Sequence, residues 1–357
     1  MRKKTVVIIS LWVIISICWA FILAMRWTDK TVYVYTDDLE SIPGVRMLDP
    51  NNDFFEIISR EPNRVNVKWE KTDIYLKGSC RVKMRENSPN VQVLAEVNDG
   101  KSYPVVIDSG ATKYLAVTDS VVLDSDLTIY PTDGLGKNVG GLCHLEKLKI
   151  GALTIVRPAC AYWLAHYERR VLGHTKWEGK KINLGLGLMK EFSYILIDNV
   201  TREVEFAANN SFNPQDNNQW HQYPMATEHD EKQKARLIVD IPLVGQPRHI
   251  KLDTGAGPGL ILTESIWTTF SSDLQILRQK KERMASPLFG WLPCKMITVE
   301  KLTLGNIPIN DARIHVIADD TPYGQNEFWL GIGFFRETVI VLDFERNLFW
   351  VRNPLQS

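Results

Sequence analysis

Short runs of β-branched and aromatic residues, separated by Gly, Asn, Asp and Pro, dominate the chain after its first 27 residues. Runs of this kind are typical of β-strands, and the periodicity of long amphipathic helices is nearly absent. Clear examples lie at 65–69, 74–77, 91–97 and 105–107. The pattern therefore predicts an all-β protein, and a length of 357 residues indicates about two domains.

The N-terminal pattern is different, because Thr5 to Met25 form 21 residues without a charge. As a helix this run just crosses a hydrocarbon core about 30 Å thick. Three cations at positions 2–4 place the N-terminus in the cytoplasm by the positive-inside rule. We therefore expect a single-pass transmembrane anchor over residues 1–27, with the remainder extracytoplasmic (periplasmic, extracellular or lumenal). A cleaved signal peptide is the alternative, with Cys18 and Ala20 before the cut.

The rest of the chain contains two copies of one unit, divided by a polar segment rich in Asn, Gln, His and Asp. Matching stretches in the two copies are 104–111 with 249–256, 145–151 with 299–305, 184–187 with 330–333, and 195–198 with 340–343. The predicted divisions are a stalk or extra strands at 28–64, an N-terminal lobe at 65–208, a linker at 209–233 and a C-terminal lobe at 234–357.

Each copy has an apolar strand that leads into an Asp-Ser/Thr-Gly turn, with Asp108 in the first copy and Asp253 in the second. A pseudo-twofold arrangement of the copies would bring the two carboxyl groups together at the lobe interface. Two carboxylates about 3 Å apart cannot both ionise, so they share a proton. One can then act as general base on a water while the other donates to a substrate carbonyl, which predicts peptide hydrolysis.

With these turns, the sequence resembles the aspartic protease clan, as two retropepsin-like units in tandem within one chain. The resemblance covers roughly residues 91–206 and 237–350. It implies a bilobal pepsin-like or retropepsin-like fold with two pseudo-twofold related β lobes. It also implies that Asp108 and Asp253 are the catalytic pair, and that four neighbours support the pair: Ser109, Gly110, Thr254 and Gly255.

The resemblance is looser at two places. Asn183 stands before Leu184-Gly185 where the family has an apolar residue, and Ala111 and Ala256 stand where pepsins have Ser or Thr. Covering hairpins are expected at 134–141 and 288–292. Within them, three residues are the predicted substrate contacts: Gly140, Phe289 and Trp291.

Composition excludes several classes of function. The chain has 42 basic and 42 acidic residues, so no electrostatic attraction to nucleic acid is expected. Its seven His show no paired metal-ligand spacing, and no metal or other cofactor is expected. Cysteine spacing allows either one disulfide or buried thiols. The basic run 174–181 is interpreted as a solvated loop.

The predicted function is a membrane-anchored aspartic endopeptidase, a hydrolase that acts on polypeptide substrates through Asp108 and Asp253. Because both Asp residues lie in one chain, the catalytic unit is expected to be monomeric. Two alternatives stay open at this point. One is a non-catalytic peptide-binding or sensor module that retains the fold, and the other is a structural envelope protein.

Overall fold

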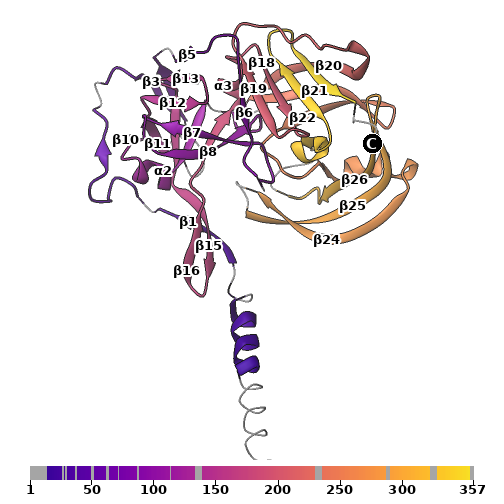
Figure 1. Ribbon diagram of the computed structural model, residues 1–357, viewed down its shortest axis with the longest axis horizontal. Coiled ribbons are helices and arrows are strands. Elements are labelled where there is room, and N and C mark those ends of the chain that lie inside the picture. Colours follow the sequence, from indigo (N-terminus) through magenta and orange to yellow (C-terminus); the bar gives the residue numbers. More distant parts are fainter. Residues whose placement is uncertain are drawn as a thin grey trace, which may run out of the picture.

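The computed structural model describes residues 14–353 apart from short gaps at 26–27, 29, 37, 50–51, 62–63, 71, 87, 113, 133–138, 230–234, 287–289 and 322–327. Strands make up most of it and form two lobes that lie side by side in Figure 1. The predicted all-β, two-lobed architecture is therefore confirmed. Helices within the lobes are short: α2 (Asp119–Asp124), α3 (Leu186–Met189), α4 (Glu264–Thr268), η1 (Asn217–Gln219), η2 (Ser271–Asp273) and η3 (Ile332–Phe335).

The first lobe is built on an eleven-stranded sheet in the order β2-β10-β11-β14-β9-β17-β8-β7-β12-β13-β5. Its central strands β9 and β17 are buried at every position, which explains their nearly continuous apolar sequences. The bounds are β2 (Arg46–Met47), β5 (Asp73–Tyr75), β7 (Gln92–Val97), β8 (Ser102–Asp108), β9 (Leu115–Thr118), β10 (Thr128–Pro131), β11 (Val139–His144), β12 (Lys147–Ile150), β13 (Leu153–Val156), β14 (Cys160–Trp163) and β17 (Ile182–Gly185).

A thirteen-stranded sheet forms the second lobe and extends between the lobes, in the order β24-β25-β26-β23-β27-β22-β21-β20-β29-β28-β18-β19-β6. Three of its strands come from the first half of the chain, and they are β6 (Ser79–Lys83), β18 (Tyr194–Asp198) and β19 (Glu203–Ala207). The others are β20 (Trp220–His229), β21 (Ala235–Leu243), β22 (Gln246–Asp253), β23 (Leu260–Thr263), β24 (Ile276–Ser286), β25 (Gly290–Leu304), β26 (Ile307–Ile317), β27 (Phe328–Gly331), β28 (Val339–Asp343) and β29 (Leu348–Arg352).

The duplication predicted from the sequence is visible in the strand pairing. In the first lobe β17 runs parallel to β8 and antiparallel to β9, and β9 runs parallel to β14. In the second lobe β27, β22, β23 and β26 repeat this arrangement. The register is also equivalent, because Asp108 pairs with Gly185 and Asp253 pairs with Gly331. Both Asp residues therefore end a central strand at the same point of the unit.

The two lobes share one sheet and one hydrophobic core. Strand β18 pairs with β28 along its whole length, from Tyr194 opposite Asp343 to Asp198 opposite Val339. Buried apolar residues of both lobes belong to one continuous cluster. The segment predicted as a linker contains β20, which pairs with both β29 and β21. The segment at 209–233 therefore forms part of the shared sheet.

The segment at 28–64 contains strands that pair with the first lobe. Strand β1 (Lys30–Tyr35) pairs with β15 (Ala165–Val171), which pairs in turn with β16 (His174–Glu178). Strand β2 adds to the edge of the eleven-stranded sheet beside β10. Strands β3 (Phe55–Glu61) and β4 (Arg64–Trp69) form a separate hairpin.

The described N-terminal helix covers residues 14–25 and projects away from the lobes in Figure 1. Among the described residues, no helix is both long and apolar enough to cross a membrane. This finding corrects the predicted transmembrane anchor, together with the membrane partner and the extracytoplasmic location that were inferred from it. Residues 5–13 of the predicted span lie outside the described residues.

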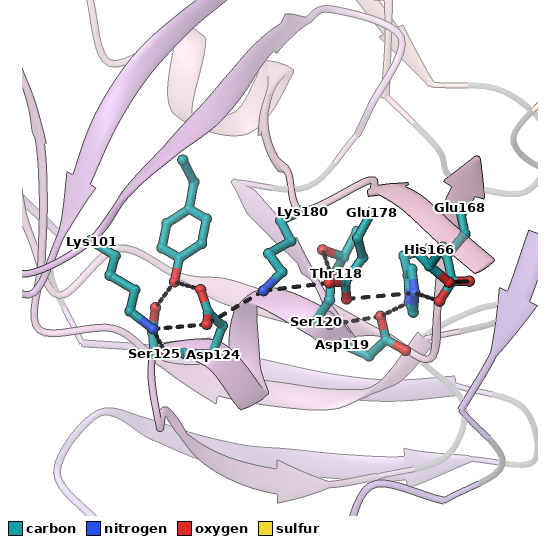
Figure 2. Close-up of polar contacts among 12 residues, drawn as sticks. Lys101, Thr118, Asp119, Ser120, Asp124, Ser125, His166, Glu168, Glu178 and Lys180 are labelled. Carbon is teal, nitrogen blue, oxygen red and sulfur yellow. Dashed lines mark hydrogen bonds and ion pairs between the residues drawn. The ribbon is translucent and has the colours of Figure 1, made fainter. Parts of the chain in front are cut away.

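A buried pair of Asp119 and His166 fixes strand β15 against helix α2 (Figure 2). Asp119 is fully buried, and its Oδ1 lies 2.8 Å from His166 Nδ1. On its other side, His166 Nε2 lies 3.2 Å from Glu168 and 3.6 Å from Glu178. Lys180 then lies 3.4 Å from Glu178. This cluster holds the β15–β16 hairpin against the first lobe. Through Lys180 it reaches the residues that precede β17.

Replacing His166 tests this anchoring. We expect His166→Ala to lower the free energy of unfolding by about 2 kcal/mol, because a buried carboxylate loses one of its hydrogen-bond partners. Urea denaturation at neutral pH measures this. His249→Ala is the matched control, since His249 contacts Asp240 and Glu228 but is 53% exposed; its loss should stay below about 1 kcal/mol. Equal losses in the two variants would contradict the buried-pair account.

Candidate functional site

The two Asp-Ser/Thr-Gly turns have the same local geometry. Oδ1 of Asp108 accepts hydrogen bonds from the N–H of Gly110 at 3.0 Å and of Ala111 at 3.1 Å. Oδ1 of Asp253 accepts the equivalent bonds from Gly255 at 2.9 Å and Ala256 at 3.0 Å. An Asp side chain that bonds its own backbone two and three residues later closes a tight turn. Each turn therefore orients its own carboxyl group.

Glycine is required in both turns because the opposite carboxyl group lies against it. A Cβ atom at Gly110 would lie 2.6 Å from the carboxyl carbon of Asp253, and one at Gly255 would lie 2.4 Å from that of Asp108. Contacts this short do not occur between a real Cβ and a carbonyl carbon. Gly110 and Gly255 thus allow the two turns to pack face to face.

Hydroxyl groups of Ser109 and Thr254 interlock beneath the two carboxyl groups. Ser109 Oγ donates to the carbonyl of Leu252 at 2.8 Å and accepts from the Thr254 N–H at 3.0 Å. Thr254 Oγ1 donates to the carbonyl of Ile107 at 2.8 Å and accepts from the Ser109 N–H at 3.0 Å. Both side chains are almost completely buried. Each lobe therefore satisfies backbone groups of the other.

The carboxyl groups of Asp108 and Asp253 are joined by a hydrogen bond, so the two lobes do bring the predicted pair together. Burial raises the pKa of Asp108, against the opposing charge of Lys181. Burial and the charge of Asp108 raise the pKa of Asp253 to about 8. The pair consequently shares one proton near neutral pH.

Two further side chains act on Asp108. Asn183 Nδ2 donates to Asp108 Oδ2 at 3.1 Å, and the largely buried Lys181 places a positive charge near the same carboxylate. Burial lowers the pKa of Lys181, and Asp108 opposes that shift. Lys181 directly precedes β17, and Asn183 belongs to it; β17 is the strand that pairs with β8.

The second lobe has a different residue at the equivalent place. Trp329 pairs with Lys251 on β22 as Asn183 pairs with Val106 on β8. Its ring is contacted by two cations, with Arg236 at 5.5 Å and Lys251 at 5.1 Å from the ring centroid. The site is therefore symmetric in its turns and asymmetric in the residues around them.

The predicted substrate contacts have different outcomes. Gly140 is packed against the first sheet: its carbonyl accepts from the hydroxyl of Tyr162 at 2.8 Å, and a Cβ there would lie 2.4 Å from the Tyr162 ring. Trp291 on β25 is 52% exposed. Phe289 lies outside the described residues. Substrate contact by any of the three stays a prediction.

Sequence reasoning missed Lys181 and undervalued Asn183. Lys181 was placed in a solvated basic run, and that interpretation is wrong for this residue because its side chain is largely buried beside Asp108. Asn183 was recorded only as a departure from an apolar pattern. The available signal was this polar residue within a strand that is otherwise apolar and ends beside the Asp108 turn.

Metal ligands do not gather near the pair, since the described residues contain no group of three or more His, Cys, Asp or Glu that could hold an ion. A cavity of about 1360 Å³ lies elsewhere in the second lobe, between β26 and η3, and neither Asp108 nor Asp253 lines it.

No protein-family model and no curated protein matches this sequence. Among solved structures, basic 7S globulin from soybean is 12% identical with a TM-score of 0.43, covering 79% of this chain and 95% of that one. Conglutin gamma, a basic 7S globulin from lupine seeds, is 11% identical with a TM-score of 0.43, covering 80% and 96%. The protein edgp is 11% identical with a TM-score of 0.44, covering 78% and 95%.

These comparisons correct the assignment made from sequence. Two of the three structures named are basic 7S globulins, and no family model supports membership in the aspartic protease clan as tandem retropepsin-like units. The predictions of an aspartic-type endopeptidase, of hydrolase activity and of a polypeptide substrate are corrected with it. The geometry of the carboxyl pair is independent of that assignment.

The hydroxyl interlock can be tested by Thr254→Val, which keeps the side-chain shape and removes the hydroxyl. The Ser109 N–H and the Ile107 carbonyl would then be buried without partners, so we expect a loss of about 3 kcal/mol in the free energy of unfolding. Guanidinium denaturation measures it. Thr268→Val is the control, because the Thr268 hydroxyl bonds the Ser265 carbonyl on an exposed helix; a loss there as large as in Thr254→Val would refute the interlock's importance.

The raised pKa of Asp253 predicts a pH dependence of stability. A group whose pKa is higher in the folded chain contributes stability that is complete below its unfolded pKa, about 4, and is lost as the pH rises through the folded value. For Asp253 this window ends at about 8. Wild type should therefore lose melting temperature relative to Asp253→Asn as the pH rises across the window. Thermal denaturation at a series of pH values measures this difference, and Asp320→Asn, at an exposed position, is the control. If wild type and Asp253→Asn lose melting temperature in parallel across the window, the prediction is wrong.

Proposed function

We propose that this chain binds a polypeptide segment over the Asp108–Asp253 pair without hydrolysing it. The observation that carries the proposal is the hydrogen bond from Asn183 to Asp108, on the carboxylate that Lys181 also stabilises. Both contacts favour the ionised form of Asp108, and Asp108 is the group that would have to accept a proton from water. The proposal concerns the described site alone and needs no metal or cofactor.

Asp108 has no lone pair left for a water. An ionised carboxylate offers about four acceptor positions. The N–H groups of Gly110 and Ala111 occupy two, Asn183 occupies the third, and the proton held by Asp253 occupies the fourth. A carboxylate with all its acceptor positions filled by the protein is a poor general base.

The pair carries a proton near neutral pH. A general acid works best when its pKa lies near the operating pH, so the acid role alone does not separate hydrolysis from binding. Burial and the nearby charge of Asp108 raise the pKa of Asp253 to about 8. The retained proton can donate to the carbonyl group of a bound peptide, and only the filled acceptor positions of Asp108 oppose hydrolysis.

Several features nevertheless favour binding of a peptide. Asp108 and Asp253 are partly exposed as residues, and Asp253 accepts backbone N–H groups on Oδ1 alone, so its other oxygen can still bond a peptide group. Asn183 is 5% exposed, and its Oδ1 is buried with no hydrogen-bond partner in the described part of the chain. An unpaired buried acceptor costs about 1–3 kcal/mol, so Asn183 is held beside Asp108 at a cost to stability, as is common for residues of a functional site.

An apolar surface adjoins the pair on the side of the second lobe. Ala256 and Trp329 are partly buried and pack on a cluster of Ile261, Met284 and Cys294. A partly exposed Trp beside polar recognition groups can bury an apolar side chain of a ligand. The site thus combines backbone recognition at the carboxyl pair with an apolar contact next to it.

The test uses reduced, carboxymethylated α-lactalbumin as an unfolded polypeptide probe. Fluorescence anisotropy measures binding at mildly acidic and neutral pH, and mass spectrometry examines the probe after prolonged incubation. We expect saturable binding, an intact probe, and at least about tenfold weaker binding for Asp108→Asn, which removes the charged acceptor. Exposed Asp320→Asn is the control and should bind as wild type does.

Either of two results would overturn the proposal. Fragments of the probe that form with wild type and are absent with Asp108→Asn and Asp253→Asn would show turnover by the pair. Absence of binding by a folded wild-type protein at every pH examined would remove the recognition role. Circular dichroism of each variant establishes that it is folded before binding is compared.

A further inference from the structure

Two buried cysteines lie opposite each other on neighbouring strands of the first lobe. Strands β11 and β14 are antiparallel, with Gly141 opposite Tyr162 and Leu142 opposite Ala161. The next position in this register places Cys143 opposite Cys160. Each is 1% exposed, and neither is in a disulfide.

The separation of these positions suits a covalent bond. Residues directly opposite in antiparallel strands have Cα atoms about 4.5–5.5 Å apart, and a disulfide spans Cα separations of about 4.4–6.8 Å. Opposite side chains also project from the same face of the sheet. In agreement with this placement, the Cys160 thiol contributes to the raised pKa of the Cys143 thiol. The expected Cα separation therefore lies within the range that a disulfide spans.

The other buried cysteines are placed differently. Cys80 Sγ lies 3.4 Å from the Ile150 carbonyl and accepts from the Ala152 N–H at 3.2 Å. Cys294 belongs to the separate apolar cluster of the second lobe. Cys80 and Cys294 therefore serve as internal controls for the pair on β11 and β14.

We propose that Cys143 and Cys160 form a disulfide that links β11 to β14, by exchange with a small disulfide such as oxidised glutathione. One cysteine thiolate attacks the donor, which forms a mixed disulfide and releases one glutathione thiolate. The second cysteine then attacks the protein sulfur of the mixed disulfide and releases the second. The two protons of the cysteine thiols pass to the two glutathione thiolates, so the protein is oxidised and the donor is reduced by two electrons.

Exchange is expected while the chain folds or opens locally. The hydrogen bond to Cys160 and burial raise the pKa of the Cys143 thiol, so little reactive thiolate exists in the closed fold. Neither sulfur is accessible there to a donor of the size of glutathione. Once formed, the bond would be shielded from reductants for the same reason.

The bond would act next to the candidate site. Strand β11 carries Gly140, whose carbonyl already accepts from Tyr162 on β14. Strand β14 pairs with β9, and β9 pairs with β17, the strand that carries Asn183. A disulfide between β11 and β14 would fix the β10–β11 hairpin to the sheet that holds the carboxyl pair.

The experiment refolds the full chain from denaturant in a glutathione redox buffer at mildly alkaline pH. Intact mass should show the loss of two hydrogens, and non-reducing peptide mapping should show a peptide that joins Cys143 to Cys160. We expect the melting temperature to exceed that of the reduced protein by about 5 °C. Adding a reductant before refolding should abolish the difference.

Matched variants make the result decisive. A double variant with Cys80→Ala and Cys294→Ala should still form the linked peptide and show the shift, whereas Cys143→Ala should show neither. If refolded wild type keeps both thiols free for alkylation, or if mapping finds either cysteine joined to another partner, the proposal is wrong. Should Cys143→Ala fail to fold, the wild-type map and the double variant decide the question without it.

Discussion

The structure depends on one reciprocal contact, in which the Ser109 and Thr254 hydroxyls each bond backbone groups of the opposite turn. Buried N–H and carbonyl groups must be paired, and here neither lobe can pair its own. The contact also brings the two carboxyl groups against the opposite glycines, where no side chain would fit. Asp108 and Asp253 therefore lie close together because the backbone N–H and carbonyl groups of the two turns are paired across the lobe interface.

The rest of the fold makes this interface rigid. The lobes share the sheet through β18 and β28, and their buried apolar residues form one cluster, so the turns cannot separate without breaking strand pairing. Strand β17, which pairs with the turn-bearing strand β8, is buried at every position, as is its other neighbour β9. A site held in this way can keep two like-charged groups in contact, because the cost of that contact is distributed over the whole core.

Asymmetry around a symmetric pair decides its chemistry. Asn183 donates a hydrogen bond to Asp108, and Lys181 places a positive charge near it. In the second lobe, Trp329 occupies the position equivalent to Asn183. Asp108 accepts from Asn183 as well as from its own turn, and burial together with the charge of Asp108 raises the pKa of Asp253 to about 8. Two turns of the same geometry thus have different surroundings in the two lobes.

The sequence by itself determined the strand-rich texture, the duplicated unit and the two Asp-Ser/Thr-Gly turns, because these follow from local residue patterns and from repetition along the chain. It did not determine that β20 lies within the predicted linker, that Lys181 is largely buried beside Asp108, or that Asn183 donates to that carboxylate. Nor did it place Cys143 opposite Cys160 on neighbouring strands. These features depend on pairing between strands far apart in the sequence, and only the tertiary structure sets which side chains then share a buried environment.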